Sequence, residues 1–484
     1  MNYKMIFYTT GQALKILGAM LLVPAVVALI YAESCIWSFL ITTAIAFALG
    51  FSLTFFFKPT SQVFYSREGL IIVALAWLSL SLIGALPYVI SGEIPHYIDA
   101  FFETVSGFTT TGSSVLADVE KLSHGMLFWR SFAQWLGGMG VLVFVMAITS
   151  KTPDRSMHIL RAEMPGPTVD KLVPRSKDTA KILYIIYVVM TGVLVIMLLA
   201  GGMPLFDSLL HAFGTAGTGG LGIKNDSVAG YNHYLQWVIA VFMMLFGINF
   251  NLYYLIIVKK VRAALKSEEM HVYVGLILFC SLAIALNLFT SAQAICSTFP
   301  DAIRISFFQV SSIITSSGFT TANVNDFPSV SKSILFVLMF IGACAGSTGG
   351  GLKVSRFIIL LKTIKKELRK VLHPRATSVV KFEGKRLNDD SIYGVTAYFA
   401  VYVSFIIGLF LLVSLFGNLS LEANFTAVVS CFNNIGPAYG EAAASYSCFS
   451  YPAKFLLALS MLFGRLEIYP LLLTLLPSTW IKNR

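Results

Sequence analysis

Four segments that lie far apart in the chain share one pattern. Each begins with an apolar run, continues through small hydroxyl, amide or glycine residues, and ends in a glycine. The segments are Glu103–Gly112, His211–Gly220, Gln309–Gly318 and Ala427–Gly436. Four copies in one chain predict that a single unit was duplicated and that the copies surround a common axis. Loops of this composition can line a cation pore with backbone carbonyl oxygens, which replace the hydration shell of the ion.

The composition places such a ring in a lipid bilayer. Hydrophobic residues make up 56% of the 484 residues and charged residues only 12%, which excludes a soluble globular protein of this length. Apolar windows of about 20 residues, enough to cross a hydrocarbon core of roughly 30 Å, recur along the chain. Ten spans are predicted, near Leu14–Tyr31, Ile36–Phe57, Leu70–Ile90, Met126–Thr149, Ile182–Ala200, Leu235–Val258, Val272–Phe289, Ile334–Leu361, Val395–Phe416 and Ala453–Leu476.

After the first two spans, one order recurs four times: a span, a half-helix, a polar glycine loop and a second span. We therefore predict an all-α polytopic membrane protein with four pseudo-repeats around a central pore and two extra N-terminal transmembrane helices. The predicted units are the N-terminal helix pair at 1–66, repeat 1 at 67–160, repeat 2 at 161–266, repeat 3 with an intramembrane loop at 267–375, and repeat 4 at 376–484.

The distribution of basic residues predicts the orientation. The segment Lys353–Arg386 holds 11 basic and 2 acidic residues, whereas the four segments around the glycine loops together hold 11 acidic and 5 basic residues. By the positive-inside rule, the basic loops and both termini face the cytoplasm and the glycine loops face outward. The net charge of +11 follows from this topology, so the sequence gives no reason to expect a nucleic acid partner.

The glycine loops are the candidate ion site. Half-helices are expected at Ala100–Phe108, Phe206–Ala212, Ile303–Ile313 and Ala423–Ser430, each pointing its partly negative C-terminal end toward the membrane centre. The candidate K⁺ site consists of Thr110, Thr111, Gly112, Thr218, Gly219, Gly220, Ser316, Ser317, Gly318, Asn434, Ile435 and Gly436. None is a carboxylate, so coordination by backbone carbonyls is expected, which suits a monovalent cation better than a divalent one.

Two further features fall below the predicted ring. Gly342–Gly351 holds five glycines in ten residues, which predicts a kink or loop in place of a continuous helix. It is not a nucleotide-binding P-loop, because Leu352 stands where that motif needs lysine. Arg465 and Glu467 lie in the last apolar span, where charged residues are costly. Arg465 either lines the pore wall or seats the loop, or it pairs with Glu467 to hold helices together.

Several motifs resemble the Trk/Ktr/HKT superfamily of cation transporters along essentially the whole chain, in its Trk branch because of the two extra N-terminal spans. The motifs are Ser106–Gly112, Trp129–Gly140, Arg161–Thr168, Ser317–Thr321, Ala345–Gly351 and Gly464–Glu467. The resemblance implies potassium selectivity, because all four loop glycines are present. It further implies a gate formed by Gly346, Ser347, Thr348, Gly349, Gly350, Gly351 and Arg465.

The resemblance also implies a location and partners. These are the bacterial inner membrane, a homodimer, and a cytosolic ring of TrkA-type subunits that carries any bound nucleotide, NAD(H) or ATP/ADP. No cofactor is expected in this chain, which has no Rossmann fingerprint of its own.

Two functions are compatible with this sequence. The favoured one is channel-like potassium uptake, and the alternative is an H⁺- or Na⁺-coupled potassium symporter on the same fold. A coupled carrier usually needs an ionisable group in its path, and the predicted filter segments contain none. An enzyme is not expected: the six cysteines lack C-x-x-C spacing and the seven histidines form no H-E-x-x-H motif. Among the histidines, His211 lies nearest to a glycine loop.

Overall fold

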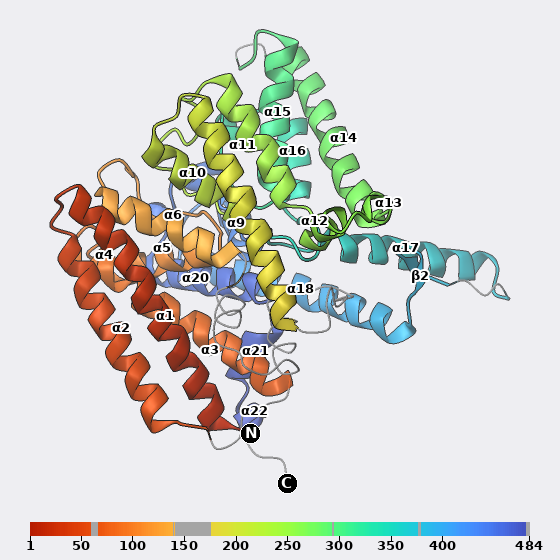
Figure 1. Ribbon diagram of the computed structural model, residues 1–484. Helices are drawn as coiled ribbons and strands as arrows, with labels where there is room; N and C mark the ends of the chain where they lie inside the picture. Colours follow the sequence, from red (N-terminus) through yellow and green to blue (C-terminus); the bar gives the residue numbers. More distant parts are fainter. Residues whose placement is uncertain (60–65, 139, 141–175, 293–294, 376–378, 481–484) are drawn as a thin grey trace.

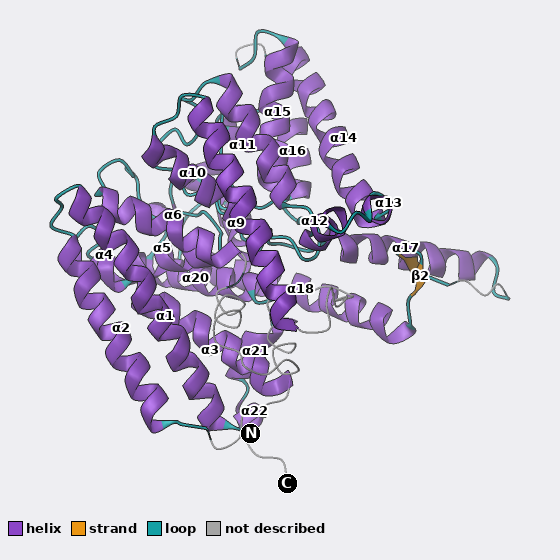
Figure 2. Cartoon of the chain, in the orientation of Figure 1, coloured by secondary structure: helices purple, strands orange, loops and turns teal. Residues whose placement is uncertain are grey.

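The computed structural model describes residues 1–59, 66–138, 140, 176–292, 295–375 and 379–480, and almost all of its regular structure is helical (Figure 2). The N-terminal pair consists of α1 (Tyr3–Ile30) and α2 (Ile36–Phe56). The later long helices are α3 (Ser66–Gly84), α6 (His124–Gly138), α9 (Ser176–Ala200), α11 (His233–Phe246), α14 (Glu268–Ser291), α16 (Ser329–Leu338), α17 (Val354–Leu372), α18 (Asp389–Leu415) and α20 (Tyr451–Arg465). The short helices outside the loops are α4 (Leu86–Ser91), α12 (Phe250–Ile257), α13 (Val261–Ala264), α21 (Tyr469–Leu475) and α22 (Pro477–Trp480).

Four helices correspond to the expected half-helices. They are α5 (Tyr97–Phe108), α10 (Leu205–Gly217), α15 (Phe299–Ile314) and α19 (Leu421–Phe432), and each contains the range predicted for it. Each carries one carboxylate in its first turn, where it balances the partial positive charge of the helix N-terminus. These carboxylates, which the sequence analysis did not single out, belong to Asp99, Asp207, Asp301 and Glu422.

The half-helices are held between the second helices of successive repeats. Helix α5 packs on α6 of its own repeat and on α20, α10 packs on α11 and α6, and α15 packs on α16 and α11. Helix α19 packs on α20, and its Phe425 ring lies 5.9 Å from that of Phe336 in α16. The repeats therefore follow one another around an axis, and the last returns to the first through the α20–α5 contact.

The membrane-spanning helices are fewer than predicted. In the described residues, six helices are long and apolar enough to cross a bilayer, and eight spans result if each of two bent pairs counts as one. The predicted span Met126–Thr149 matches α6 at its start, but its second half lies outside the described residues, as does the motif Arg161–Thr168. The predicted span Ile334–Leu361 is interrupted, as the glycines indicated, because α16 ends at Leu338 and α17 begins at Val354.

Two spans predicted as continuous are sharply bent. Helices α11 and α12 meet at 90°, and Asn249 restarts the chain there by accepting a hydrogen bond from the backbone N–H of Asn251 at 2.9 Å. Helices α20 and α21 meet at 120°, and the residues between them include Glu467 and Ile468 with φ of +54° and +66°. Both windows are continuously apolar, and hydropathy carries no information about such breaks.

One small element departs from the all-α prediction. Strands β1 (Lys381–Phe382) and β2 (Lys385–Arg386) form an antiparallel hairpin in the basic segment. The hairpin lies beside α17, which extends away from the helical body (Figure 1). Glu383 at its tip accepts hydrogen bonds from the Ser267 hydroxyl at 2.8 Å and the Glu269 backbone N–H at 3.0 Å. The hairpin is thus fixed to the first turn of α14.

Candidate functional site

Each half-helix ends in the same backbone turn. In the first loop, the N–H of Thr110 donates to the Gly107 carbonyl at 3.1 Å and the N–H of Thr111 donates to the Ser106 carbonyl at 2.9 Å. This is the Schellman arrangement, in which one residue adopts a left-handed conformation. The same two hydrogen bonds recur in the other three loops. The left-handed residues are Thr110, Thr218, Ser316 and Asn434, with φ of +56°, +54°, +56° and +56°.

A side chain in this conformation is unfavourable by about 1–2 kcal/mol, and glycine usually occupies the position. Strain repeated in all four loops marks them as one functional unit. The repetition also fixes the register of the second loop, which is richer in glycine than the others. Thr218, Gly219 and Gly220 occupy the positions held by Thr110, Thr111 and Gly112 in the first loop.

The four loop glycines interlock with the carbonyl groups of neighbouring loops. A Cβ built on Gly112 would lie 2.0 Å from the Gly219 oxygen, and one on Gly220 would lie 1.8 Å from the Ser317 oxygen. The corresponding distances are 2.3 Å from Gly318 to the Ile435 oxygen and 2.7 Å from Gly436 to the Thr111 oxygen. These four contacts run from loop 1 to 2, 3, 4 and back to 1. They form a closed ring with no space for any side chain at the glycines.

The predicted ion-site residues are brought together by this ring, and most are buried. Of the twelve, only Gly112 and Gly318 retain partial exposure. Hydroxyl and amide groups brace the ring from within: the Thr109 and Thr111 hydroxyls are 2.7 Å apart, and the Asn434 amide donates to the Thr111 hydroxyl at 2.9 Å. His211 does not join them, since its Nδ1 lies 2.8 Å from the Asp207 carbonyl and its ring stacks on Phe319.

The glycine-rich segment packs directly against the third and fourth loops. Its two ends meet, because the N–H of Gly342 donates to the Leu352 carbonyl at 2.8 Å. Between them, the N–H of Gly350 donates to the Ser316 hydroxyl at 2.6 Å, and a Cβ on Gly350 would lie 2.6 Å from the Asn433 oxygen. The segment therefore contacts the C-terminal ends of α15 and α19, where an ion leaving the ring would pass.

Arg465 joins this segment to the first repeat. Its guanidinium donates to the Thr348 carbonyl at 2.9 Å and to the Gly138 carbonyl at 2.8 Å, with a further bond to Gly137. Glu467 pairs instead with Arg356, which also lies over the Tyr398 ring at 4.1 Å. The alternative in which Arg465 serves to pair with Glu467 is therefore wrong. A sharp turn with positive φ at Glu467 separates the two side chains.

A buried carboxylate holds both ends of the glycine-rich segment, and the sequence analysis missed it. Glu269 accepts hydrogen bonds from the backbone N–H groups of Ala345 at 2.8 Å and Ser355 at 3.0 Å, through the same oxygen. The Glu269 side chain is buried. In the sequence, Glu269 resembles any carboxylate in the first turn of a helix, so no sequence signal identifies its role.

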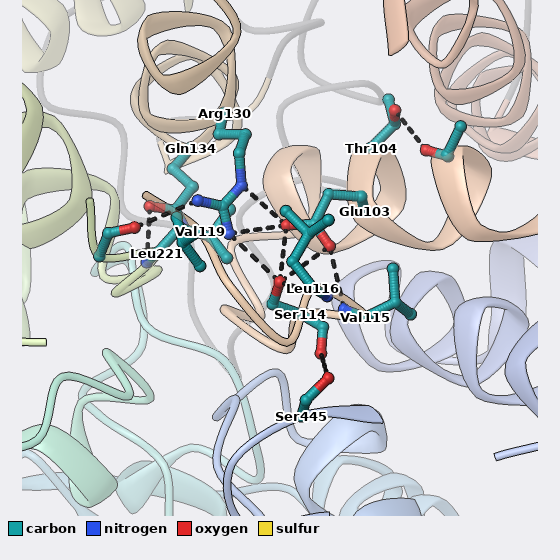
Figure 3. Close-up of polar contacts among 12 residues, drawn as sticks. Glu103, Thr104, Ser114, Val115, Leu116, Val119, Arg130, Gln134, Leu221 and Ser445 are labelled. Carbon is teal, nitrogen blue, oxygen red and sulfur yellow. Dashed lines mark hydrogen bonds and ion pairs between the residues drawn. The ribbon is translucent and has the colours of Figure 1, made fainter. Parts of the chain in front are cut away.

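A second missed group lies behind the first loop (Figure 3). Glu103 and Arg130 form a buried ion pair at 2.7 Å. Glu103 also accepts hydrogen bonds from the Ser114 hydroxyl and the Val115 N–H, each at 3.1 Å, and Arg130 donates to the Gly222 carbonyl at 3.1 Å. The pair thereby connects the loops of repeats 1 and 2. A Glu and an Arg within apolar windows are a signal for such a pair.

Together these features define a class of protein. It is a helical membrane protein in which four re-entrant loops form a closed ring around one axis, and a separate glycine-rich loop packs against that ring. Irregular backbone at membrane depth is stable only when it is buried in protein or faces a water-filled cavity. Such a ring is the kind of structure that conducts ions.

Comparison with known proteins gives the family. A sequence model of the TrkH family, described as a cation transport protein, matches residues 36–482, and the chain belongs to this family. It is 35% identical to the Trk system potassium uptake protein TrkH of Salmonella typhimurium, over 99% of this chain and 100% of that protein. It is 33% identical to the Trk system potassium uptake protein TrkG of Escherichia coli, over 98% and 97% of the two chains.

A solved structure agrees with these relatives. The crystal structure of the potassium transporter TrkH from Vibrio parahaemolyticus matches with a TM-score of 0.90 and 31% identity, covering 99% of this chain and 100% of that one. The predicted helical membrane fold is thereby confirmed. The domain boundaries and the roles of the individual site residues stay predictions.

Proposed function

We propose that this chain forms a potassium-selective, channel-like pore for potassium uptake across the bacterial inner membrane. The observation that carries the proposal is the closed ring of four loops, in which each glycine is packed against a carbonyl of the next loop. The carbonyl ends of the four half-helices converge on this ring and favour a cation. The names of the relatives, Trk system potassium uptake proteins, support the choice of ion.

The alternative is an ion-coupled potassium symporter. Coupling to protons normally uses an ionisable group exposed to the transport path. The buried carboxylates near the ring are each engaged: Glu103 by Arg130, Glu467 by Arg356, and Glu269 by two backbone N–H groups. This arrangement favours the channel, since protonation of any of them would break an existing contact.

Purified protein in liposomes separates the two functions. Under opposed potassium and proton gradients, a channel gives a reversal potential that follows the potassium gradient alone. A reversal potential that moves with the proton or sodium gradient would establish symport and overturn the channel proposal.

We further propose that the glycine-rich segment is the gate, with Arg465 seating it, and that both termini are cytoplasmic. The basic residues on α17 and those that follow α12 support this orientation. The proposed assembly is a homodimer on a cytosolic TrkA-type ring, with any NAD(H) or ATP/ADP bound by the ring. Flux measured with and without added ring protein, at each nucleotide, tests this assignment.

A further inference from the structure

A groove of about 620 Å³ lies between the two N-terminal helices, at the edge of the molecule (Figure 1). Helices α1 and α2 are not part of the four-loop ring, and the proposed function assigns them no role. The residues that line the groove include Tyr8, Gln12 and Lys15 from α1, Phe51 and Phe55 from α2, and Lys58 just after α2.

The close approach of the two helices holds Lys15 in this groove. A Cβ built on Gly50 would lie 2.8 Å from Cγ of Lys15, so the lysine stem crosses directly over the bare backbone of α2. Its ammonium group ends 4.3 Å from the centre of the Phe51 ring, a cation–π contact. Lys15 is therefore positioned by the helix packing.

The groove carries two positive charges. In the described part of the chain, the ion pairs between side chains involve neither Lys15 nor Lys58. Phe55 and Phe56 beside it are 79% and 74% exposed. The groove thus combines unneutralised cations with a large apolar surface.

The length of the helices places the cations at a membrane boundary. Counting from the opposite end of α1 at Ile30, Lys15 lies about 22 Å along the helix axis. Because the hydrocarbon core is roughly 30 Å thick, the long side chain of Lys15 extends toward the headgroups of the leaflet nearer the chain termini. Lys58 follows the end of α2 in the same leaflet.

We propose that this groove binds an anionic phospholipid, with the phosphate held between Lys15 and Lys58 and the acyl chains lying on the exposed phenylalanines. The exposed apolar surface favours a lipid over a free phosphate. A second copy of the chain is disfavoured, because a two-fold interface would oppose lysine to lysine. The proposal depends on the membrane placement of α1 and α2 and not on potassium transport.

The test measures lipid retention by the full-length protein in detergent. The protein is titrated with dioleoyl phosphatidylglycerol or dioleoyl phosphatidylcholine, and bound lipid is counted by native mass spectrometry. The test variant is Lys15→Gln with Lys58→Gln, and the matched control is Lys259→Gln with Lys260→Gln, which removes two exposed cations from another loop. We expect the test variant to retain about tenfold less phosphatidylglycerol than the control, with phosphatidylcholine unchanged.

Further arms decide the remaining outcomes. Lys15→Arg with Lys58→Arg keeps the charge and should keep the lipid, which separates loss of charge from misfolding. Equal retention by the test and control variants would overturn the proposal. Competition by millimolar inorganic phosphate that displaces the lipid completely would assign the groove to a free anion. A change in oligomeric state by light scattering with unchanged lipid retention would assign it to a protein contact.

Discussion

Arg130 and Glu103 form an ion pair 2.7 Å long, in which 2% and 0% of the two side chains remain exposed. Each partner also binds backbone of a different loop: Glu103 accepts the N–H of Val115, and Arg130 donates to the carbonyl of Gly222. Only the first repeat has a carboxylate at this position. The other three segments begin with His211, Gln309 and Ala427. The connection between loops 1 and 2 is therefore different in kind from those around the rest of the ring.

Removing one partner of this pair should be more damaging than removing both. Arg130→Gln leaves a buried carboxylate without its cation, and we expect a loss of about 3–5 kcal/mol in the free energy of unfolding. The double variant Glu103→Gln with Arg130→Gln should recover part of this loss, because no charge remains buried. Thermal unfolding in detergent measures both. If the double variant is as unstable as the sum of the two single variants, the two residues do not act as a pair.

Substitution at a loop glycine should weaken selectivity. In Gly112→Ser, the new Cβ would lie 2.0 Å from the Gly219 oxygen, and φ of +82° is unfavourable for serine, so loops 1 and 2 must move apart. We expect the permeability of sodium relative to potassium to rise about tenfold, which corresponds to 1.4 kcal/mol of lost discrimination.

Gly222→Ser is the matched control for this substitution. It lies in the second loop, but its Cβ would have 3.4 Å of clearance from its nearest neighbours. Unchanged selectivity in the Gly112 variant, or an equal change in both variants, would contradict the assignment of the ring as the filter.

Shortening the glycine-rich segment should raise flux without any cytosolic partner. Gly342 and Leu352 are already hydrogen-bonded to each other, so deleting residues 345–350 leaves a short connection between ends that meet. The deletion removes the contacts of Gly349 and Gly350 with the loop ends. Potassium flux in liposomes, normalised to folded protein, measures the effect. A folded deletion variant that conducts no better than the parent would show that the segment is not the barrier.

Acid should weaken the contact between the N-terminal helix pair and repeat 1. Glu33, in the loop after α1, is partly buried, which alone would raise its pKa, but hydrogen bonds from the N–H groups of Gly125 and His124 lower the pKa below 4.5 overall. A carboxylate with a lowered pKa stabilises the fold above the unfolded-state pKa and loses that effect as the pH falls through the folded-state pKa.

The midpoint of thermal unfolding should therefore fall below about pH 4.5, and Glu33→Gln should flatten this part of the pH profile. Glu367→Gln, at an exposed position on α17, serves as the control and should leave the profile unchanged. Identical profiles for the Glu33 variant and the parent would exclude Glu33 as the group responsible.

The sequence was most informative where a pattern repeats. The four glycines and the half-helices were identifiable because each copy supports the others, and α5 differs from its predicted range only by three residues at its start. The bends after Phe246 and after Arg465 were not identifiable, since they depend on a few local φ and ψ values within apolar windows. The partner of Arg465 was not identifiable either. Glu467 is two residues away in sequence, yet a positive-φ turn directs it to Arg356.

Removing Arg465 should open the pore without destabilising the protein severely. Its guanidinium contacts carbonyl groups of Thr348 and of Gly137 and Gly138, so Arg465→Ala frees the glycine-rich segment from the first repeat. It also removes a positive charge whose repulsion of a cation at 4 Å is about 4 kcal/mol at an effective dielectric constant near 20. We expect potassium flux to rise about tenfold or more.

Arg356→Ala provides the contrast, because it leaves Glu467 buried without its partner and should lower the unfolding midpoint. Flux per folded protein, measured beside thermal stability, decides the matter. An Arg465 variant that is as unstable as the Arg356 variant and conducts no faster than the parent would show that Arg465 only holds helices together.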